Sequence, residues 1–191
     1  NGSLWAWGNN AYGQLGNNSN QNTITPIQVG GSNLWIKVSA GQQHTAAIQT
    51  PGTLWIWGRN DFGALGNNTT TTYSSPIQVG SLSTWTAVAC GYYHTVAIQT
   101  TGTLWAWGLN TYGQLGNNST TSYSSPVQIG NLSTWTSVAA GVYHTVALQT
   151  SGTVWAWGLN SWGQLGNNTI TNYSSPVQIS NIVINIWNTI A

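Results

Sequence analysis

The sequence predicts an all-β fold, a β-propeller of four-stranded antiparallel blades, from about four repeats of roughly 50 residues that form part of a larger or inter-chain assembly. Two observations predict this fold. The sequence superimposes on itself when it is shifted by 50 residues, without insertions across four copies. Each copy also contains short runs of β-forming residues between clusters of turn residues, and none has a helical period. Such a period is typical of propellers, solenoids and repeat arrays.

The repeat is defined by short motifs that recur in a constant order. The first is Leu-Trp-Ala-Trp-Gly at 4–8, which returns with small changes at 54–58, 104–108 and 154–158. The same shift aligns prolines and histidines, namely Pro26, Pro76, Pro126 and Pro176, and His44, His94 and His144. We therefore expect one tandem-repeat domain over residues 1–191, with repeats at about 3–52, 53–102, 103–152 and 153–191.

Four runs in the third repeat have strand character, at 103–107, 126–129, 135–139 and 144–149. They are rich in Trp, Val, Ile and Thr, which favour strands. We expect these runs to form the four strands of one blade. The Trp-Ala-Trp run is apolar on both faces, as expected for a sheet packed between two neighbouring sheets. Trp105 is accordingly predicted to be a core residue, with stacking on a sugar as the alternative.

A loop of about 17 residues separates the first strand of each repeat from the strand that begins at proline. Gly8 ends the first strand, and Gly13 and Gly16 are predicted to adopt positive φ where the loop turns back. Loops of this length are usually functional or held by their own packing. One aromatic residue is predicted to anchor the loop in each repeat, at Tyr12, Phe62, Tyr112 and Trp162.

The chain carries almost no charge. Its charged side chains are Lys37, Arg59 and Asp61, and its net charge is +1. Nucleic-acid-binding proteins neutralise phosphates with clustered Lys and Arg, so we expect no nucleic-acid partner. The apolar runs end after four or five residues, too few for a membrane-spanning helix. A nearly neutral surface also lacks the repulsion that keeps proteins apart, which favours self-association.

The motifs together resemble the regulator-of-chromosome-condensation repeat family over essentially the whole chain. In the third repeat they read Gly-Thr-Leu-Trp-Ala-Trp-Gly, Asn-x-Tyr-Gly-Gln-Leu-Gly, Ser-Pro-Val-Gln and Val-Ala-Ala-Gly-x-x-His-Thr-x-Ala-Leu. The resemblance implies a propeller, usually of seven blades, so three full repeats and a partial fourth are not expected to close a ring alone. It also implies exchange activity on a small GTPase, but that activity relies on charged contacts that this chain lacks.

We predict no catalytic residue, no metal site and no cofactor. Acid–base catalysis by paired carboxylates is excluded by composition, because the chain has one Asp and no Glu. Cys90 replaces an alanine of the neighbouring repeats and is predicted to be a small buried residue. The three aligned histidines could in principle converge on zinc. We instead expect each imidazole to bond backbone in its own Gly-x-x-His-Thr turn.

Glycosylation sequons recur in the long loops, with candidate acceptors at Asn17, Asn67, Asn117 and Asn167. Further sequons begin at Asn68, Asn118 and Asn131. Duplication of a single ancestral sequon would produce the same pattern. Occupancy requires secretion, and an extracellular or cell-surface location is our expectation.

Positions that differ between otherwise similar repeats are the better guide to specific binding, because shared positions serve the shared fold. These candidates for partner binding are Gln42, Gln43, Arg59, Asp61, Tyr92, Tyr93 and Tyr143. Exposed Tyr, Gln and Asn are common at protein interfaces. Neutral drift on a solvated loop is the alternative explanation.

Two classes of function follow. The first is a non-enzymatic structural or adhesive extracellular protein that self-associates, as an oligomer or as the subunit of a filament. The alternative is a propeller that recognises a protein partner through its loop face, as an inhibitor or adaptor. We also expect another chain, or the remainder of a longer one, to cover the terminal strands at 3–7 and 187–190.

Overall fold

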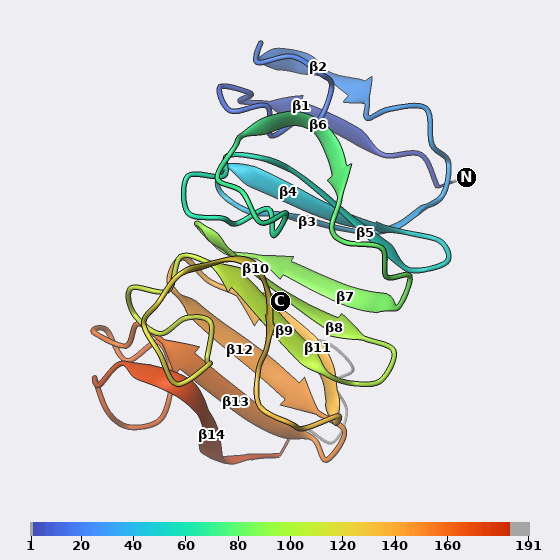
Figure 1. Ribbon diagram of the computed structural model, residues 1–191. Helices are drawn as coiled ribbons and strands as arrows, with labels where there is room; N and C mark the ends of the chain where they lie inside the picture. The colour runs from blue at the N-terminus through green and yellow to red at the C-terminus, as the bar shows by residue number, and fades with distance from the viewer. Residues whose placement is uncertain (1, 184–191) are drawn as a thin grey trace.

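The computed structural model describes residues 2–183, and all of their regular structure is β. The strands form three four-stranded sheets and one two-stranded sheet, which follow one another along the chain (Figure 1). The β-propeller architecture predicted from the sequence is confirmed. None of these residues forms a helix long and apolar enough to cross a membrane.

Neighbouring strands pair antiparallel within every sheet, and each sheet is continuous in chain order. The two-stranded sheet contains β1 (Trp5–Gly8) and β2 (Thr23–Gln28). The first full blade contains β3 (Trp35–Ala40), β4 (His44–Gln49), β5 (Thr53–Gly58) and β6 (Tyr73–Gln78). The second contains β7 (Trp85–Cys90), β8 (His94–Gln99), β9 (Leu104–Gly108) and β10 (Tyr123–Gln128). The third contains β11 (Trp135–Ala140), β12 (His144–Gln149), β13 (Thr153–Gly158) and β14 (Tyr173–Val183).

Each blade combines strands from two successive sequence repeats, so the expectation that one repeat supplies one whole blade was wrong. The first full blade takes β3 and β4 from the repeat at 3–52 and β5 and β6 from the next. The cause is the tight turn between β4 and β5, in which the amide of Gly52 donates to the carbonyl of Gln49 at 2.6 Å. So short a connection keeps the two strands together as a hairpin.

The outermost strand of a blade begins earlier than the sequence indicates. In the second blade β10 starts at Tyr123, whereas the strand was predicted to start at Pro126. The pairing of β10 with β9 shifts register between Tyr123 and Val127, around this proline. Proline is tolerated there because an outermost strand has one edge that needs no backbone donor.

The apolar core lies between the blades. Trp57, Trp107 and Trp157, the second tryptophans of the Trp-x-Trp motifs, are fully buried. Trp107 belongs to β9, but it packs in one cluster with Leu54 and Ile56 of the preceding blade. Trp105, predicted to be core, is only partly buried beside the same cluster. Burial of the second tryptophan therefore joins neighbouring blades, and the first lies nearer the rim.

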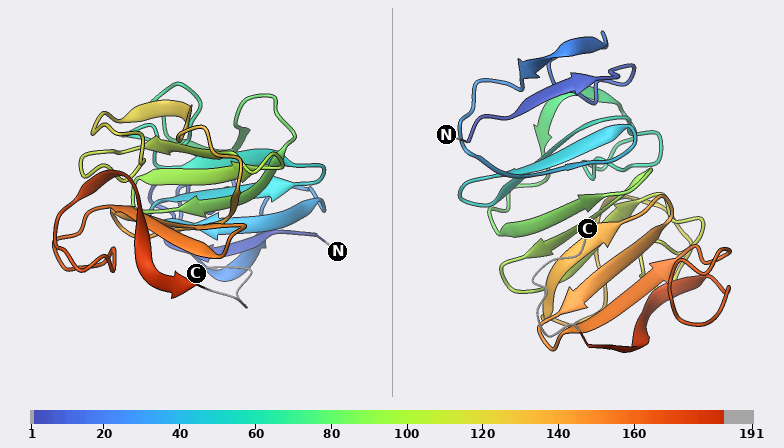
Figure 2. Two further views of the ribbon diagram at one scale, coloured as in Figure 1. Left: turned by 90° about the horizontal axis from the view of Figure 1, so that it is seen from below. Right: turned by 180° about the vertical axis from the view of Figure 1, so that it is seen from behind.

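The two-stranded sheet leaves one side of its tryptophan strand uncovered among the described residues. Trp7, which is equivalent to Trp57, is 60% exposed, and Trp5 is 50% exposed. Figure 2 shows this sheet at one end of the stack, with β14 at the other. Covering of strand 3–7 by further β-structure stays a prediction, and the segment 187–190 lies outside the described residues.

Candidate functional site

The long loop of each repeat folds around one buried asparagine. Asn110 Nδ2 donates to Asn117 Oδ1 at 3.1 Å and to the carbonyls of Ser119 and Thr121, both at 2.9 Å. Its Oδ1 accepts the amide of Leu115 at 2.9 Å. The equivalent asparagine has no exposed surface in any repeat, at Asn10, Asn60, Asn110 and Asn160. The asparagine side chain thus supplies hydrogen bonds to loop backbone groups that have no strand partner.

The predicted aromatic anchors are only partly correct. Tyr12 and Tyr112 are partly buried, but Phe62 is 39% exposed and Trp162 is 83% exposed. The buried asparagine holds the loop instead. The predicted positive φ of Gly13 and Gly16 is confirmed, at 76° and 72°.

A carbonyl of the loop fixes it to the following blade. The carbonyl of Gln114 accepts Trp157 Nε1 at 2.9 Å and Thr145 Oγ1 at 2.8 Å. Gly116 is required at this contact, because a Cβ there would lie 2.6 Å from Trp157 Nε1 and its φ is +82°. The long loop is therefore hydrogen-bonded to the core of the following blade, and these bonds fix the position of its surface residues.

Each buried histidine bonds across to the next blade, which corrects the expectation that it bonds backbone in its own turn. His94 Nε2 lies 3.1 Å from Thr145 Oγ1, and His44 Nε2 lies 3.0 Å from Thr95 Oγ1. Each hydroxyl donates its single proton to a loop carbonyl, Gln114 or Ala64, at 2.8 Å. The hydroxyl must then accept from Nε2–H, which fixes the neutral Nε2–H tautomer.

Burial makes the two histidines and Cys90 chemically unreactive. It lowers the pKa of His44 to about 4 and, with the neighbouring charges of His44 and His144, that of His94 to about 3. Burial also raises the pKa of the Cys90 thiol to about 12, so no thiolate forms at neutral pH. Cys90 is buried, as predicted. The described residues contain no group of three or more His, Cys, Asp or Glu side chains placed to hold a metal ion.

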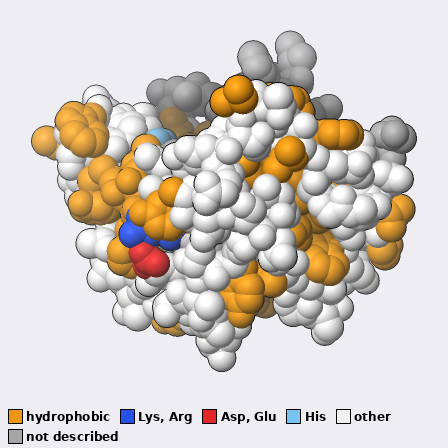
Figure 3. All heavy atoms as spheres, turned by 90° about the horizontal axis from the view of Figure 1, so that it is seen from above, with side chains coloured by type: hydrophobic (Ala, Val, Ile, Leu, Met, Phe, Trp, Pro, Cys, Tyr) orange, Lys and Arg blue, Asp and Glu red, His pale blue; other side chains and the backbone are white. Residues whose placement is uncertain are grey.

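Several predicted partner-binding residues meet around Arg59 on the loop face. The Arg59 guanidinium donates to Gln43 Oε1 at 2.6 Å and to the Tyr93 hydroxyl at 3.0 Å. It also pairs with Asp61 at 2.5 Å and lies over the rings of Tyr12 and Tyr93, 4.6 and 5.2 Å from their centroids. Figure 3 shows the chain's one acidic side chain, in red, beside blue basic atoms and orange hydrophobic side chains.

Aromatic rings extend this cluster across neighbouring repeats. The centroid of Phe62 lies 4.9 Å from that of Tyr93, and Tyr93 lies 4.1 Å from Tyr92. Tyr92 lies 5.7 Å from Tyr143, which lies 5.2 Å from Tyr112. We call this continuous surface the aromatic row; its members are Tyr12, Arg59, Phe62, Tyr92, Tyr93, Tyr112 and Tyr143.

The aromatic row is uncharged apart from one internally paired cation. Burial lowers the pKa of Arg59, but the hydrogen bond and charge of Asp61, together with the charges of Tyr93 and Tyr12, outweigh burial and raise that pKa above its usual value. Burial and the hydrogen bond to Tyr92 raise the pKa of Tyr93 to about 12, against the lowering effect of Arg59. Arg59 is therefore charged and Tyr93 neutral at physiological pH.

The structure brings most of the predicted partner-binding residues into one surface, and the remaining one, Gln42, is exposed. The candidate acceptors for glycosylation belong to the buried loop networks: Asn67 Oδ1, for example, accepts Asn60 Nδ2 at 3.2 Å and Thr69 Oγ1 at 2.9 Å. Glycosylation at Asn17, Asn67, Asn117 and Asn167 stays a prediction. Sequence reasoning missed the buried asparagine, although its identity in all four repeats, beside variable neighbours, is a signal for it.

Residues 1–190 match the family model of the RCC1-like domain. No curated protein matches the chain. The solved structure of Prp20p from Saccharomyces cerevisiae, described with its binding to Gsp1p and histones, superimposes with a TM-score of 0.84 at 22% identity, over 94% of this chain and 46% of that one. Human WBSCR16 superimposes with a TM-score of 0.83 at 24% identity, over 94% of this chain and 48% of that one.

Yeast RCC1 (Prp20) bound to Kap60 gives a TM-score of 0.83 at 22% identity, over 94% of this chain and 45% of that one. The chain thus spans a little under half the length of these relatives. The prediction of an extracellular or cell-surface location is wrong, because these relatives point away from it: Prp20p binds histones, which are intracellular proteins. Neither the family nor these structures support a filament.

Proposed function

The chain belongs to the RCC1-like domain family, and on that premise we propose that it is a non-catalytic protein-binding module of the adaptor or inhibitor type. Its recognition surface is the aromatic row on the loop face. The continuity of that row across neighbouring repeats carries the proposal, because it joins variable positions such as Arg59, Tyr93 and Tyr143 to the aromatic residues of the long loops.

The residue types of the aromatic row are those that carry binding energy at protein interfaces. Tyr and Arg are enriched among the residues whose truncation costs most, and they cluster at interface centres. Here Arg59 is held in place by Gln43, Asp61 and Tyr93 before any partner arrives. Binding therefore costs little additional side-chain entropy.

The charge of the chain limits the class of partner. A relative, Prp20p, binds histones, but a strongly basic partner needs acidic residues, and this chain has one Asp, already paired with Arg59. The row offers ring faces, hydroxyls and one guanidinium. It suits a partner surface that is neutral and rich in hydrogen-bond acceptors.

Site-specific photo-crosslinking in an extract of source cells tests this proposal. A photoreactive amino acid replaces Val142, which is 52% exposed and adjoins Tyr143. The matched control carries it in place of Leu34, which is 55% exposed in the loop before β3, at the opposite end of the strands. We expect one protein to crosslink at position 142 and not at 34, and to be lost when Tyr92→Ser and Tyr143→Ser are added. Equal crosslinking at both positions, or none at 142, contradicts the proposal.

A further inference from the structure

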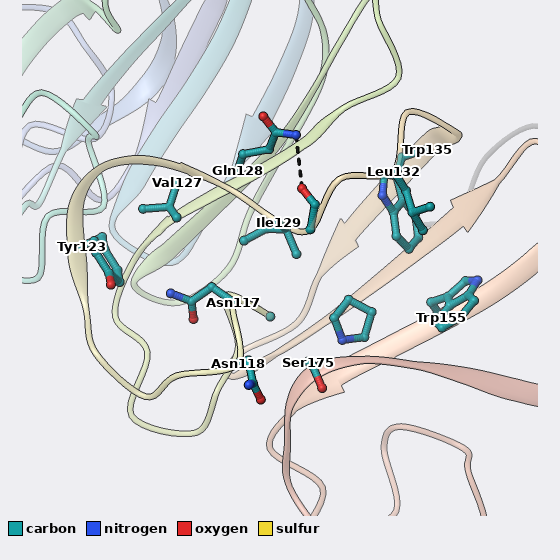
Figure 4. A pocket seen from close by; sticks show the side chains of 13 residues that line it. Asn117, Asn118, Tyr123, Val127, Gln128, Ile129, Leu132, Trp135, Trp155 and Ser175 are labelled. Carbon is teal, nitrogen blue, oxygen red and sulfur yellow. Dashed lines mark hydrogen bonds between the residues drawn. The ribbon is translucent and has the colours of Figure 1, made fainter.

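Neighbouring sheets are joined by the same contact at every junction that residues 2–183 form. The long loop of one sheet lies on the next sheet, where the amide of Asn118 donates to the carbonyl of Ser174 at 2.7 Å. The carbonyl of Gln114 in this loop accepts Trp157 Nε1 at 2.9 Å. Figure 4 shows Asn118 beside Ser175, the next residue of β14. The residues 50 and 100 positions earlier form the same bonds, so a loop and the following tryptophan strand are the two halves of one junction.

One half of this junction is uncovered at each end of the stack that residues 2–183 form (Figure 2). At the first end, which we call the strand end, β1 and β2 present Trp7, which is 60% exposed although its equivalents in the other repeats are fully buried. At the second, the loop end, residues 162–170 present Gly166, which is exposed although the equivalent Gly116 is buried. The described chain therefore carries both halves of a further junction, and the two are complementary to each other.

The two ends are more apolar than the equivalent surfaces inside the stack. Ile24 at the strand end takes the position of a serine in the other three repeats, and Ile170 at the loop end takes that of an asparagine or a threonine. The most exposed large apolar side chains of the described residues all belong to these two ends: Ile24 at 98%, Trp162 at 83%, Ile170 at 73% and Trp7 at 60%. Monomeric proteins rarely expose such patches. Added apolar surface is what a junction between separate chains needs, because association also costs translational and rotational entropy.

From this complementarity we infer that two copies of the chain associate, each placing its loop end on the strand end of the other. In this contact the carbonyl of Gln164 accepts Nε1 of Trp7 of the second copy, and the amide of Asn168 donates to the carbonyl of its Ile24. These are the bonds that the equivalent residues form between neighbouring sheets. A second copy is favoured as the occupant because the chain already forms this contact within itself, with the same residue types.

Two copies also suit the curvature of the stack. The chain superimposes on 46% of Prp20p and on 48% of WBSCR16, so its two ends are separated by about half of such a propeller. A twofold axis then brings each loop end to the other copy's strand end, which forms the contact twice and closes the pair. The contact surface lies at the ends of the stack and goes beyond the aromatic row.

Light scattering and analytical ultracentrifugation of the full chain measure the association. We expect a mass twice that of the 20.4 kDa chain, which falls to the mass of one chain on dilution. The indole N–H signal of Trp7 in ¹⁵N-correlated NMR spectra, assigned from a Trp7→Phe variant, should exchange slowly with solvent in the pair and rapidly after dilution. A mass of one chain at every concentration, or an open series of larger species, would overturn the inference.

Variants at the two ends localise the contact. Ile24→Ser introduces the residue of the other repeats, so the fold tolerates it. Because each pair contains this position twice, the dissociation constant should rise about a hundredfold. Trp162→Asp should abolish the pair. Leu82→Asp, at a residue 48% exposed in the loop between the first and second blades, is the matched control and should change nothing. Association that depends on only one of the two ends, or equally on Leu82, contradicts the contact.

The native protein in an extract of source cells provides the last comparison, and we expect it to have twice the mass of its own chain. A native mass of one chain would show that another segment occupies the two ends, and the inference would then be wrong. The Tyr92→Ser, Tyr143→Ser variant should associate as the unmodified chain does. Failure of this inference and failure of the aromatic row are therefore distinguishable.

Discussion

At the scale of single residues, the most informative side chains are polar groups buried at equivalent positions. The sequence shows that Asn110 has a counterpart in every repeat, but nothing in a propensity or an apolar period says that it is buried. Its role depends on carbonyls that lie nine and eleven residues ahead and turn back towards it. Local sequence patterns do not encode such contacts, and for this reason they indicate the more conspicuous aromatic residues as the anchors.

Replacement of Asn110 by alanine should destabilise the protein by roughly 2–4 kcal/mol, because it leaves the amide of Leu115 and two loop carbonyls without partners. Urea unfolding measures the loss. Thr111→Ala, at an exposed residue of the same loop, is the control and should change stability little. Equal unfolding midpoints for the two variants would refute the structural role of Asn110.

The buried histidines predict a stability that falls in acid. The pKa of His44 is lowered to about 4 and that of His94 to about 3, both below the ordinary value of 6.5. As the pH drops below 6.5, His44 and His94 therefore bind protons in the unfolded chain but not in the folded chain. The stabilisation is fully present above pH 6.5 and is lost progressively as the pH falls towards 4 and then 3.

Urea unfolding between pH 7 and pH 4 measures this dependence, and we expect the midpoint to decrease progressively once the pH falls below 6.5. The His94→Gln variant, which cannot titrate at this position, should show a shallower decrease. A midpoint that stays constant or rises on acidification would show that the histidines are not held neutral by burial.

At the scale of strands and blades, the sequence predicts the elements better than their grouping. The predicted strand at 144–149 coincides with β12, and 135–139 lies within β11. The grouping was missed because a repeat can be divided at any phase of its period. The predicted boundary at residue 52 falls in the tight turn between β4 and β5, and this turn keeps both strands in one blade. The blades divide between β6 and β7 instead.

The two tryptophans of one strand should contribute unequally. Trp107→Ala empties a fully buried site and removes the bond from Nε1 to the carbonyl of Ala64, so we expect a loss of about 3–5 kcal/mol. Trp105→Ala should cost clearly less, because this side chain is only partly buried beside the cluster that contains Trp107. Thermal and urea unfolding of the two variants measure the difference. The reverse order would contradict the packing of β9 between blades.

At the scale of the whole molecule, the repeat motifs predict the propeller correctly, whereas the sequons mislead about location. Duplication of one ancestral sequon multiplies it with the repeat, so the number of sequons carries no information about secretion. The aromatic row was partly predictable, since variable positions identify six of its residues or immediate partners: Gln43, Arg59, Asp61, Tyr92, Tyr93 and Tyr143. Their convergence was not predictable, because it depends on placing neighbouring repeats side by side.

The central claim is that the aromatic row binds a protein partner, and the equilibrium affinity of the crosslinked partner tests it most directly. Calorimetry with the purified partner compares the unmodified chain, the Tyr92→Ser, Tyr143→Ser variant and the Leu34→Ser control. Loss of the two rings should weaken binding about tenfold or more, while Leu34→Ser and moderate salt leave it nearly unchanged. An affinity unaffected by the tyrosine substitutions, or one abolished by salt, would contradict the account.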